Sequence, residues 1–392
     1  MIFHVHYYDK IILLENIDGI ITELSMEQYE LLKLFNKGYD NESVIKTLLS
    51  NETLSKEQVK LLNDNINGFR SICENQDLFL DDNFTETGET GKYYPRVLNL
   101  ELTDKCNFYC GHCYKEAKIQ NKVFLSEKIL DKLYSEYAGK IAVLHLTGGE
   151  PLLYPKLDKY VRKLSEKFCI NITTNGSLVH TWSEEMISKV NNFQISLYGY
   201  DEESYEYVTK TKGSFKKVIQ TMDRLNELGK FFTIGITLNK VVCDNIEKYI
   251  TLLKKYNVSK IIFSLAANVG RGKEVSFWNI TNGDLEHLVS YMRQNATLKS
   301  NYESLSLDDE ESTECNENDC TAGRSQITVS EKGKLIYCNV LDHDFFSMGS
   351  FEQLEKHVQK GLEVGIFHKK INEYRTCQDC KNHICPLINS NK

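Results

Sequence analysis

The feature that most restricts the fold of this chain is a regular alternation of strand-like and helix-like segments between residues 97 and 265. The strand candidates are 97–103, 142–147, 169–174, 193–197, 231–238 and 260–265. The helix candidates lie near 126–138, 156–168, 183–190, 214–228, 245–256 and 283–297. Parallel strands need crossover helices, so the pattern predicts an α/β fold with a parallel sheet curved into a partial (β/α)6 TIM-like barrel. Chemistry in such barrels takes place at the carboxyl ends of the strands.

The first 82 residues follow a different pattern, with short strands first and helices after them. Strand candidates at 2–8, 11–14 and 20–22 precede helix candidates at 26–36, from 41 onward and at 56–73. This order predicts an α+β winged-helix module over residues 1–82 and a linker over 83–95. Residues 1–94 carry 8 basic and 17 acidic side chains, while the net charge of the whole chain is −8. An acidic module is a poor partner for phosphate backbones, so we expect no nucleic-acid binding.

Twelve cysteines indicate metal or redox chemistry. The chain has no signal-peptide pattern and no apolar run of about 18 residues, so we expect a cytoplasmic protein without a membrane partner. Clustered thiols in a reducing compartment indicate metal binding or catalysis more often than disulfides. Nine of them form three groups, which are Cys106, Cys110 and Cys113; Cys315, Cys320 and Cys338; and Cys377, Cys380 and Cys385. The isolated Cys73, Cys169 and Cys243 lie in apolar segments and are predicted to be buried packing residues.

The first cysteine group has the pattern CxxxCxxC and directly follows the first barrel strand. Three thiolates on one loop can hold three irons of a [4Fe–4S] cluster and leave the fourth iron open to a small molecule. The alternative is a zinc knuckle that uses His112 as a further ligand. The next strand ends in Gly148, Gly149 and Glu150, where the glycines permit close approach of a ligand and the carboxylate can accept from an ammonium.

CxxxCxxC after the first strand, GGEP after the second, TTNG at 173–176 and ISL at 195–197 occur in the order typical of radical S-adenosylmethionine (SAM) enzymes. Residues 96–280 therefore resemble that family. The resemblance implies that Cys106, Cys110 and Cys113 hold a [4Fe–4S] cluster whose open iron chelates SAM. It also implies SAM contacts from Gly148, Gly149, Glu150, Asn175 and Ser196. For Asn175 and Ser196, the alternative is an ordinary polar role in a turn and a strand.

The resemblance implies a reaction that begins with one electron from a reductant such as flavodoxin or ferredoxin. SAM is then cleaved to a 5′-deoxyadenosyl radical, which abstracts hydrogen from a substrate. His112 would pack either on the adenine of SAM or within its own loop. Arg271 lies in a GRG segment similar to one found after the sixth strand in many members. Its planar fork would contact the SAM carboxylate, or else it is a solvated surface residue.

The C-terminal cysteines resemble those of SPASM domains, which carry auxiliary iron–sulfur clusters. The spacing of Cys320, Gly333 and Cys338 fits the SPASM signature, and the last group resembles its CxxC…C portion. The final gap is one residue short, however, and the last two cysteines of the signature are absent. Two fully cysteine-ligated clusters need eight thiolates, but Cys315, Cys320, Cys338, Cys377, Cys380 and Cys385 supply six. We therefore expect one or two auxiliary [4Fe–4S] clusters in a domain over 301–392, after a barrel over 96–300. A zinc ribbon is the alternative.

Fused to such a barrel, residues 1–82 resemble the module that binds the leader of a ribosomal precursor peptide by strand addition. The resemblance implies a peptide maturase, with a thioether crosslink as the favoured product. A carbon–carbon crosslink, an epimerised residue or a formylglycine made by a sulfatase-type maturase are the other enzymatic outcomes. A metal-dependent transcriptional regulator is the non-enzymatic one, and the acidic module argues against it. No catalytic acid or base stands out.

Overall fold

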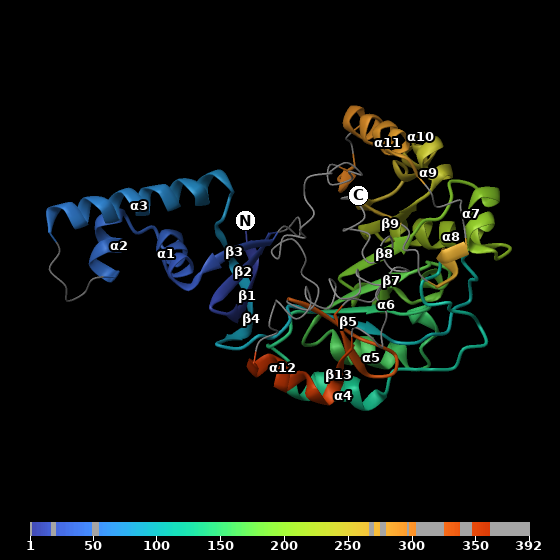
Figure 1. Cartoon of the computed structure of the whole chain (residues 1–392), viewed down its shortest axis with the longest axis horizontal. Helices are drawn as coiled ribbons and strands as arrows, with labels where there is room; N and C mark the ends of the chain where they lie inside the picture. Colours follow the sequence, from blue (N-terminus) through green and yellow to red (C-terminus); the bar gives the residue numbers. More distant parts are fainter. Residues whose placement is uncertain are drawn as a thin grey trace, which may run out of the picture. The chain divides into compact units, whose positions relative to one another are not determined.

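The computed structural model describes residues 2–16, 21–48, 55–265, 270–274, 280–295, 298–302, 325–337 and 347–360. The chain divides into two compact units (Figure 1). The N-terminal unit comprises Met1–Arg96 together with the short segments Gly139–Ala142 and Lys356–Gly361, and the second unit comprises the rest. Within the described ranges, no helix has both the length and the apolar character that crossing a membrane requires.

The N-terminal unit combines a four-stranded sheet with three helices. Its elements are β1 (Ile2–Asp9), β2 (Ile11–Asn16), β3 (Ile21–Ser25), α1 (Met26–Asn36), α2 (Asn41–Leu48), α3 (Lys56–Asn75) and β4 (Leu80–Thr90). The strand order is β3-β2-β1-β4, with β1 antiparallel to β2 and parallel to β4. Ser25 begins α1 with a capping box, in which its hydroxyl accepts from Gln28 N and Gln28 Oε1 accepts from Ser25 N.

One apolar core holds these helices against the sheet. Ile12 and Leu14 of β2, Tyr29 of α1 and Cys73 of α3 are each fully shielded from solvent. The buried state of Cys73 is the one expected from its apolar surroundings. Phe35 and Phe69 pack with their ring centroids 6.0 Å apart and so join α1 to α3. The helices are therefore fixed to the sheet by burial of the apolar faces seen in the sequence.

Residues 83–90 differ from the expected linker, because they form most of the strand β4. This strand has no apolar alternation, and polar contacts hold it to β1 instead. Thr87 Oγ1 lies 2.9 Å from His4 Nε2 and 2.8 Å from His6 Nδ1. Gly88 has φ +82°, and a Cβ there would lie 2.1 Å from the carbonyl oxygen of Tyr7. Glycine thus permits a close backbone approach that the polar sequence did not reveal.

The second unit contains a nine-stranded sheet whose central part is parallel. Its first six strands are β5 (Val97–Glu101), β6 (Val143–Thr147), β7 (Cys169–Thr174), β8 (Asn192–Ser196), β9 (Phe232–Leu238) and β10 (Val258–Leu265). They lie side by side in chain order, and every neighbouring pair is parallel. This arrangement confirms the α/β fold with a partial barrel.

Helices follow the strands (Figure 1). They are α4 (Glu127–Glu136), α5 (Leu157–Leu164), α6 (Glu184–Ser188), α7 (Glu202–Thr209), α8 (Ser214–Glu227), α9 (Lys240–Asp244), α10 (Ile246–Leu253) and α11 (Asn282–Gln294). All of them except α7 and α9 correspond to helix candidates of the sequence analysis. The paired Leu98 and Leu144 are fully buried on one face of the sheet, whereas the paired Asn99 and His145 lie on the other. The sheet thus has one apolar face and one face that carries polar side chains.

Three further strands extend the sheet beyond β5, and the sequence analysis did not predict them. They are β11 (Gln326–Val329), β12 (Lys334–Ile336) and β13 (Ser347–Ser350), followed by α12 (Leu354–Lys360). β11 runs parallel to β5, and Asn99 Nδ2 donates to Thr328 Oγ1 at 3.1 Å. β12 and β13 then add in antiparallel fashion. The strands were missed because they are only three or four residues long and lie among turn-forming residues.

The two isolated cysteines of the second unit differ in their exposure to solvent. Cys243 in α9 is buried, as expected. Cys169 is exposed at the start of β7, so its prediction as a buried packing residue is wrong. A strand that begins at the rim of a sheet exposes its first residue even when the following residues are apolar. Cys315, Cys320, Cys338, Cys377, Cys380 and Cys385 lie outside the described residues.

Candidate functional site

The three cysteines of CxxxCxxC lie on the loop between β5 and α4, which we call the cluster loop (residues 102–126). Cys106 and Cys110 are buried, and Cys113 is partly exposed. Backbone amides point at two of the sulfur atoms: Phe108 N donates to Cys106 Sγ and Ala117 N to Cys113 Sγ, both at 3.4 Å. Such N–H···S contacts stabilise a sulfur anion, which is the form of cysteine that binds metals.

The chemistry of these thiols fits an iron–sulfur cluster better than a single metal ion. Burial and the neighbouring thiols Cys106 and Cys113 hold the pKa of Cys110 well above its usual range. Three thiolates gathered here need a positively charged partner. Among the residues that the structure describes, no three His, Cys, Asp or Glu side chains converge as one ion requires. His112, which the zinc knuckle would use as a further ligand, is packed against Tyr198, and the three thiols that remain are the ligand set of an open [4Fe–4S] cluster.

The glycines of GGEP lie directly against the backbone of the cluster loop. A Cβ on Gly149 would be 2.2 Å from the carbonyl oxygen of Lys105, and one on Gly148 would be 2.5 Å from that of Thr103. Gly149 N donates to Thr103 O at 2.6 Å, and Glu150 N donates to Lys105 O at 2.8 Å. Because Gly148 and Gly149 have no side chains, the cluster loop can pack directly against the end of β6. The sequence analysis expected the glycines to admit a ligand and missed this contact.

Glu150 is fully buried at the carboxyl end of β6. Its Oε1 accepts from Thr174 Oγ1 at 2.7 Å and from Leu152 N at 3.1 Å, and its Oε2 accepts from Asn175 N at 2.9 Å. Burial nevertheless raises the pKa of this carboxyl to about 7. The three donors fix the carboxylate in one orientation at the edge where the first three barrel strands end. It remains able to accept from a cationic ligand, which would lower its pKa again.

Asn175 joins the end of β7 to the cluster loop. Its Nδ2 donates to Asn107 Oδ1 at 2.9 Å and lies 3.8 Å from Cys106 Sγ, while its Oδ1 accepts from Ser177 N at 2.9 Å. Asn107 in turn donates to Ser177 Oγ at 2.8 Å. The structure therefore brings Asn175 together with Glu150 and Cys106. Asn107 belongs to the same group, and its position beside a cysteine ligand was the available signal for it.

Ser196 ends β8, and its carbonyl oxygen accepts from Tyr205 OH at 3.1 Å. Aromatic rings fill the space between this strand end and the cluster loop. The His112 ring lies 5.0 Å from that of Tyr198, and Phe108 packs edge-on against Tyr205. His112 is thus packed against a residue outside its own loop, and burial lowers its pKa to about 4, while packing on the adenine of SAM stays a prediction. A neutral imidazole here avoids placing a further charge beside the sulfur ligands.

Arg271 donates three hydrogen bonds to the backbone of the cluster loop. Its Nε donates to Cys110 O at 2.9 Å, its Nη2 to Ala117 O at 3.1 Å, and its backbone N to Cys113 O at 3.1 Å. The guanidinium also stacks on the Tyr109 ring, 4.1 Å from its centroid. Arg271 is therefore bound to the cluster loop, which differs from the solvated surface residue of the alternative, and its contact with the SAM carboxylate stays a prediction. It holds the backbone on both sides of Cys113.

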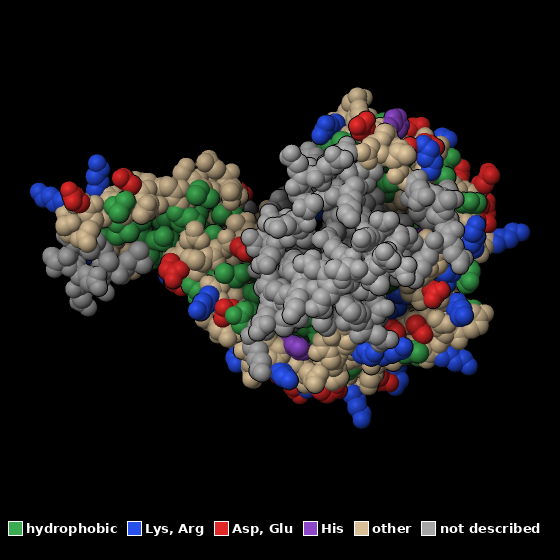
Figure 2. All heavy atoms as spheres, viewed as in Figure 1, with side chains coloured by type: hydrophobic (Ala, Val, Ile, Leu, Met, Phe, Trp, Pro, Cys, Tyr) green, Lys and Arg blue, Asp and Glu red, His purple; other side chains and the backbone are tan. Residues whose placement is uncertain are grey.

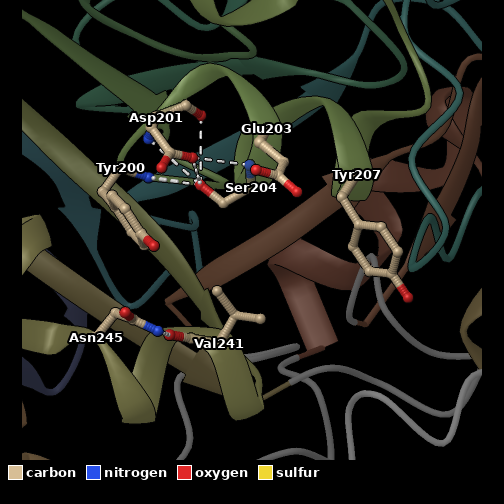
Figure 3. A pocket seen from close by; sticks show the side chains of 7 residues that line it. All are labelled: Tyr200, Asp201, Glu203, Ser204, Tyr207, Val241 and Asn245. Atoms are coloured by element: carbon tan, nitrogen blue, oxygen red, sulfur yellow. Dashed lines mark hydrogen bonds between the residues drawn. The ribbon is translucent and has the colours of Figure 1, made fainter.

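A separate cavity of about 400 Å³ lies where the segments after β8 and β9 meet (Figure 3). Tyr200, Asp201 and Tyr207 line it together with Glu203, Ser204, Val241 and Asn245. The Asp201 carboxylate accepts two hydrogen bonds from Ser204, one from its backbone N at 2.8 Å and one from its hydroxyl at 2.6 Å. Asp201 therefore serves as the N-cap of α7. The cavity contains none of the site residues expected from the sequence.

The sequence analysis did not identify a group of three charged residues at the cluster loop. Lys115 Nζ lies 2.7 Å from Glu101 Oε2 and 2.8 Å from Glu331 Oε2, and all three side chains are buried. A signal existed for one of them, since Glu101 interrupts the apolar run of the first barrel strand. A carboxylate at such a place needs a buried partner. Nothing in the sequence indicated that Lys115 and Glu331 would supply the other charges.

Comparison with known proteins agrees with this geometry. A family model described as the Radical SAM superfamily matches residues 100–253. The radical SAM cyclopropyl synthase TigE of Paramaledivibacter caminithermalis is 23% identical over 378 residues, covering 87% of this chain and 78% of TigE. A GTP 3′,8-cyclase of Rhizobium etli is 31% identical over 188 residues. That match covers 46% of this chain, which spans about half the length of the cyclase.

Solved structures have a similar fold over a longer part of the chain. The crystal structure of SuiB from Streptococcus suis bound to S-adenosylmethionine aligns with a TM-score of 0.61 at 15% identity, covering 99% of this chain and 92% of SuiB. SuiB bound to precursor peptide SuiA aligns with a TM-score of 0.63 at 16% identity, over the same shares of both chains. The motifs, the parallel sheet and the family match concern the same residues. Residues 100–253 of this chain match the Radical SAM superfamily.

Proposed function

We propose that this enzyme is a maturase that modifies a ribosomal precursor peptide and recognises that peptide through its N-terminal unit. The observation that carries the proposal is the edge of the four-stranded sheet at β3. β3 and β4 form the two edges of this sheet among the described residues, and on β4 the amide of Gly88 already donates to Gly139 O at 3.0 Å. An extended peptide can add to such an edge through main-chain hydrogen bonds.

The helical side of the same unit supports a peptide partner. Leu61 and Ile72 of α3 are 63% and 47% exposed, and Figure 2 shows apolar side chains gathered alongside this helix. Their spacing of eleven residues places both on one face of α3. Gly68 lies between them on this face and has no side chain to cover it. The structural neighbour SuiB was solved with a precursor peptide, which agrees with this proposal.

The site residues divide into two roles in this proposal. Cys106, Cys110 and Cys113 would hold the [4Fe–4S] cluster, which with SAM supplies a 5′-deoxyadenosyl radical when bound. Glu150 would accept from the amino group of SAM, because its carboxylate is buried and oriented by three donors. Asn175 and Arg271 hold the cluster loop in place. The polar face of the sheet, with His145 lying 2.6 Å from Thr173 Oγ1, would face the peptide.

We propose a thioether as the bond that is formed. The basis is the count of six C-terminal thiols, two fewer than two fully cysteine-ligated clusters need. An auxiliary cluster with an open position could bind the thiolate of a substrate cysteine. The name of TigE favours a carbon–carbon bond instead, and that is the second candidate. Both products have lost two hydrogen atoms relative to the peptide.

Anaerobic reconstitution with SAM, reduced flavodoxin and the short peptide encoded beside this gene tests the function. Loss of two hydrogen masses shows bond formation. A thioether removes one iodoacetamide-reactive thiol from the peptide, whereas a carbon–carbon bond leaves all thiols reactive. Solvent deuterium incorporation without loss of hydrogen indicates an epimerase. SAM cleavage with an unchanged peptide would contradict the maturase proposal for this peptide.

Hydrogen exchange tests the docking edge separately. The precursor peptide is expected to slow amide exchange in β3, because strand addition pairs amides that now face solvent. β4 serves as the internal control, since it forms the opposite edge of the same sheet. A peptide without its leader should protect neither strand. Protection confined to β4, or to the barrel, would contradict recognition at β3.

A further inference from the structure

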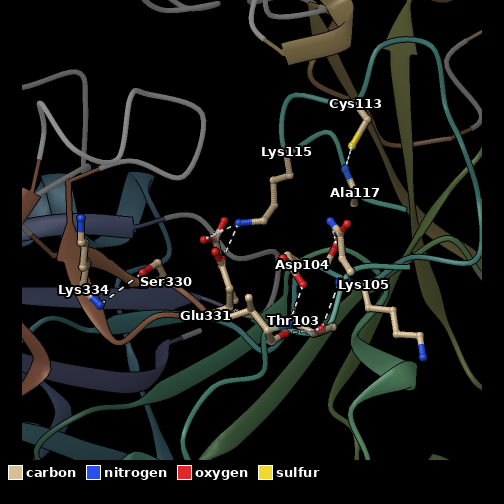
Figure 4. Close-up of polar contacts among 12 residues, drawn as sticks. Thr103, Asp104, Lys105, Cys113, Lys115, Ala117, Ser330, Glu331 and Lys334 are labelled. Atoms are coloured by element: carbon tan, nitrogen blue, oxygen red, sulfur yellow. Dashed lines mark hydrogen bonds and ion pairs between the residues drawn. The ribbon is translucent and has the colours of Figure 1, made fainter. Parts of the chain in front are cut away.

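The side chain of Lys115 in the cluster loop is buried together with the carboxylates of Glu101 and Glu331, and Figure 4 shows Lys115 beside Glu331. Lys115 follows Cys113 by two residues, Glu101 ends β5, and Glu331 lies in the turn between β11 and β12. Their side chains are 5%, 0% and 8% exposed. Lys115 Nζ lies 2.7 Å from Glu101 Oε2 and 2.8 Å from Glu331 Oε2. The Lys115 ammonium therefore pairs with two carboxylates, and these belong to segments that are far apart in the chain.

The three groups depend on each other for physical reasons. An ionised group loses its hydration when it is buried, and a close opposite charge must compensate for that loss. The ammonium has three donor hydrogens, so it can bond to both carboxylates at once. Without Lys115, the two carboxylates would repel each other across a site that solvent hardly reaches. Without Glu331, the turn would lose its charged contact with the cluster loop.

Each partner belongs to a segment that is anchored elsewhere. The β11–β12 hairpin is held by the pairing of β11 with β5 and by a tight turn in which Gly333 N donates to Ser330 O at 2.8 Å. On its other side, the cluster loop is held by Arg271. Lys115 is thus the point where the loop with the three thiols meets the hairpin. The chain continues from that hairpin directly to Cys338.

We propose that Lys115 is a positioning residue that couples the cluster loop to the β11–β12 hairpin. Its contact with Glu101 fixes the loop on the first barrel strand, and its contact with Glu331 fixes the hairpin on the loop. A displacement of the hairpin therefore disturbs the loop, and a displacement of the loop disturbs the hairpin. The coupling is independent of which peptide the enzyme modifies.

Hydrogen exchange on the full-length protein without its cluster tests this coupling. Glu331→Gln is expected to accelerate exchange in residues 106–117 about tenfold, because a hydrogen bond to a charged group is lost. Lys115→Met should accelerate exchange both there and in residues 326–336. Lys115→Arg, which keeps the charge, should restore most of the protection. The control variants are Lys118→Met, an exposed lysine of the same loop, and Glu352→Gln, an exposed glutamate after the hairpin.

A double-mutant cycle makes the test independent of overall stability. If Lys115 and Glu331 are coupled, Lys115→Met and Glu331→Gln together change exchange in the loop by less than the product of the two single effects. After anaerobic reconstitution, Glu331→Gln should also alter the electron paramagnetic resonance signal of the SAM-bound cluster at wild-type iron content. Wild-type exchange of the loop in Glu331→Gln would overturn the proposal. So would an effect of Lys115→Met that is confined to the loop.

Discussion

The Nε of Arg271 donates to the carbonyl oxygen of Cys110 at 2.9 Å, across 161 residues of sequence. The contact places a permanent positive charge beside a loop that presents three thiols. It also fixes the direction of the peptide group between the second cysteine and the residue after it. Geometry and electrostatics at Arg271 therefore both favour the conformation in which the thiols are gathered.

We predict that Arg271→Lys lowers the iron content obtained by anaerobic reconstitution. The guanidinium reaches the carbonyl oxygens of Cys110 and Ala117 from two separate nitrogen atoms, Nε and Nη2, whereas a lysine has a single nitrogen and lacks this planar fork. Loss of about one charged hydrogen bond corresponds to roughly 2 kcal/mol of loop stability. Iron and sulfide quantification checks the outcome. Full iron content combined with weakened SAM binding would instead favour contact between Arg271 and the SAM carboxylate.

The close contact at Gly149 predicts a large effect of a single methyl group. In Gly149→Ala, the new Cβ would lie 2.2 Å from the carbonyl oxygen of Lys105, so the cluster loop must move. We expect a loss of roughly 3 kcal/mol in the free energy of unfolding. Gly111→Ala in the same loop is the matched control, since nothing lies within 4 Å of its new Cβ. Equal urea midpoints of the two variants would contradict this packing role.

Glu150 predicts a pH dependence of stability in the protein without its cofactors. Burial raises the pKa of this carboxyl to about 7, above its ordinary value of 4.5. The folded state therefore holds a proton that the unfolded state has released. The associated stability is complete below pH 4.5 and is lost as the pH rises through about 7. Glu150→Gln should reduce the decline of unfolding free energy between pH 5 and pH 8, and should also weaken SAM binding. An unchanged decline would show that other groups cause it.

His6 predicts the opposite pH dependence for the N-terminal unit. Burial lowers the pKa of this histidine to about 3, and its Nε2 lies 2.8 Å from Tyr94 O. The folded state holds neutral His6, so the associated stability is complete above pH 6.5 and is lost as the pH falls toward 3. Amide exchange in β1, corrected for its intrinsic pH dependence, should accelerate between pH 6.5 and pH 5. His6→Gln should weaken this acceleration, whereas His287→Gln on the exposed side of α11 should not.

The sequence was sufficient to predict features that depend on local patterns. The α1 boundaries followed from Ser25 and the apolar spacing after it, and the barrel followed from strands that alternate with helices. Features that depend on distant contacts could not be predicted in this way. β4 lacks apolar alternation because Thr87 and Gly88 meet β1 through polar and backbone contacts. The partners of Lys115 lie 14 and 216 residues away, and nothing in a local pattern specifies such distances.

The pairing of β11 with β5 has a consequence for biosynthesis. Asn99 and Thr328, which are hydrogen-bonded across these strands, lie 229 residues apart in the chain. A ribosome that adds about 5–20 residues per second needs roughly 10–45 s to make the intervening segment. During that interval, the first strand of the barrel is already synthesised while its outer neighbour is not. The first strand of the barrel thus acquires its partner β11 only after the five strands β6–β10 have been synthesised.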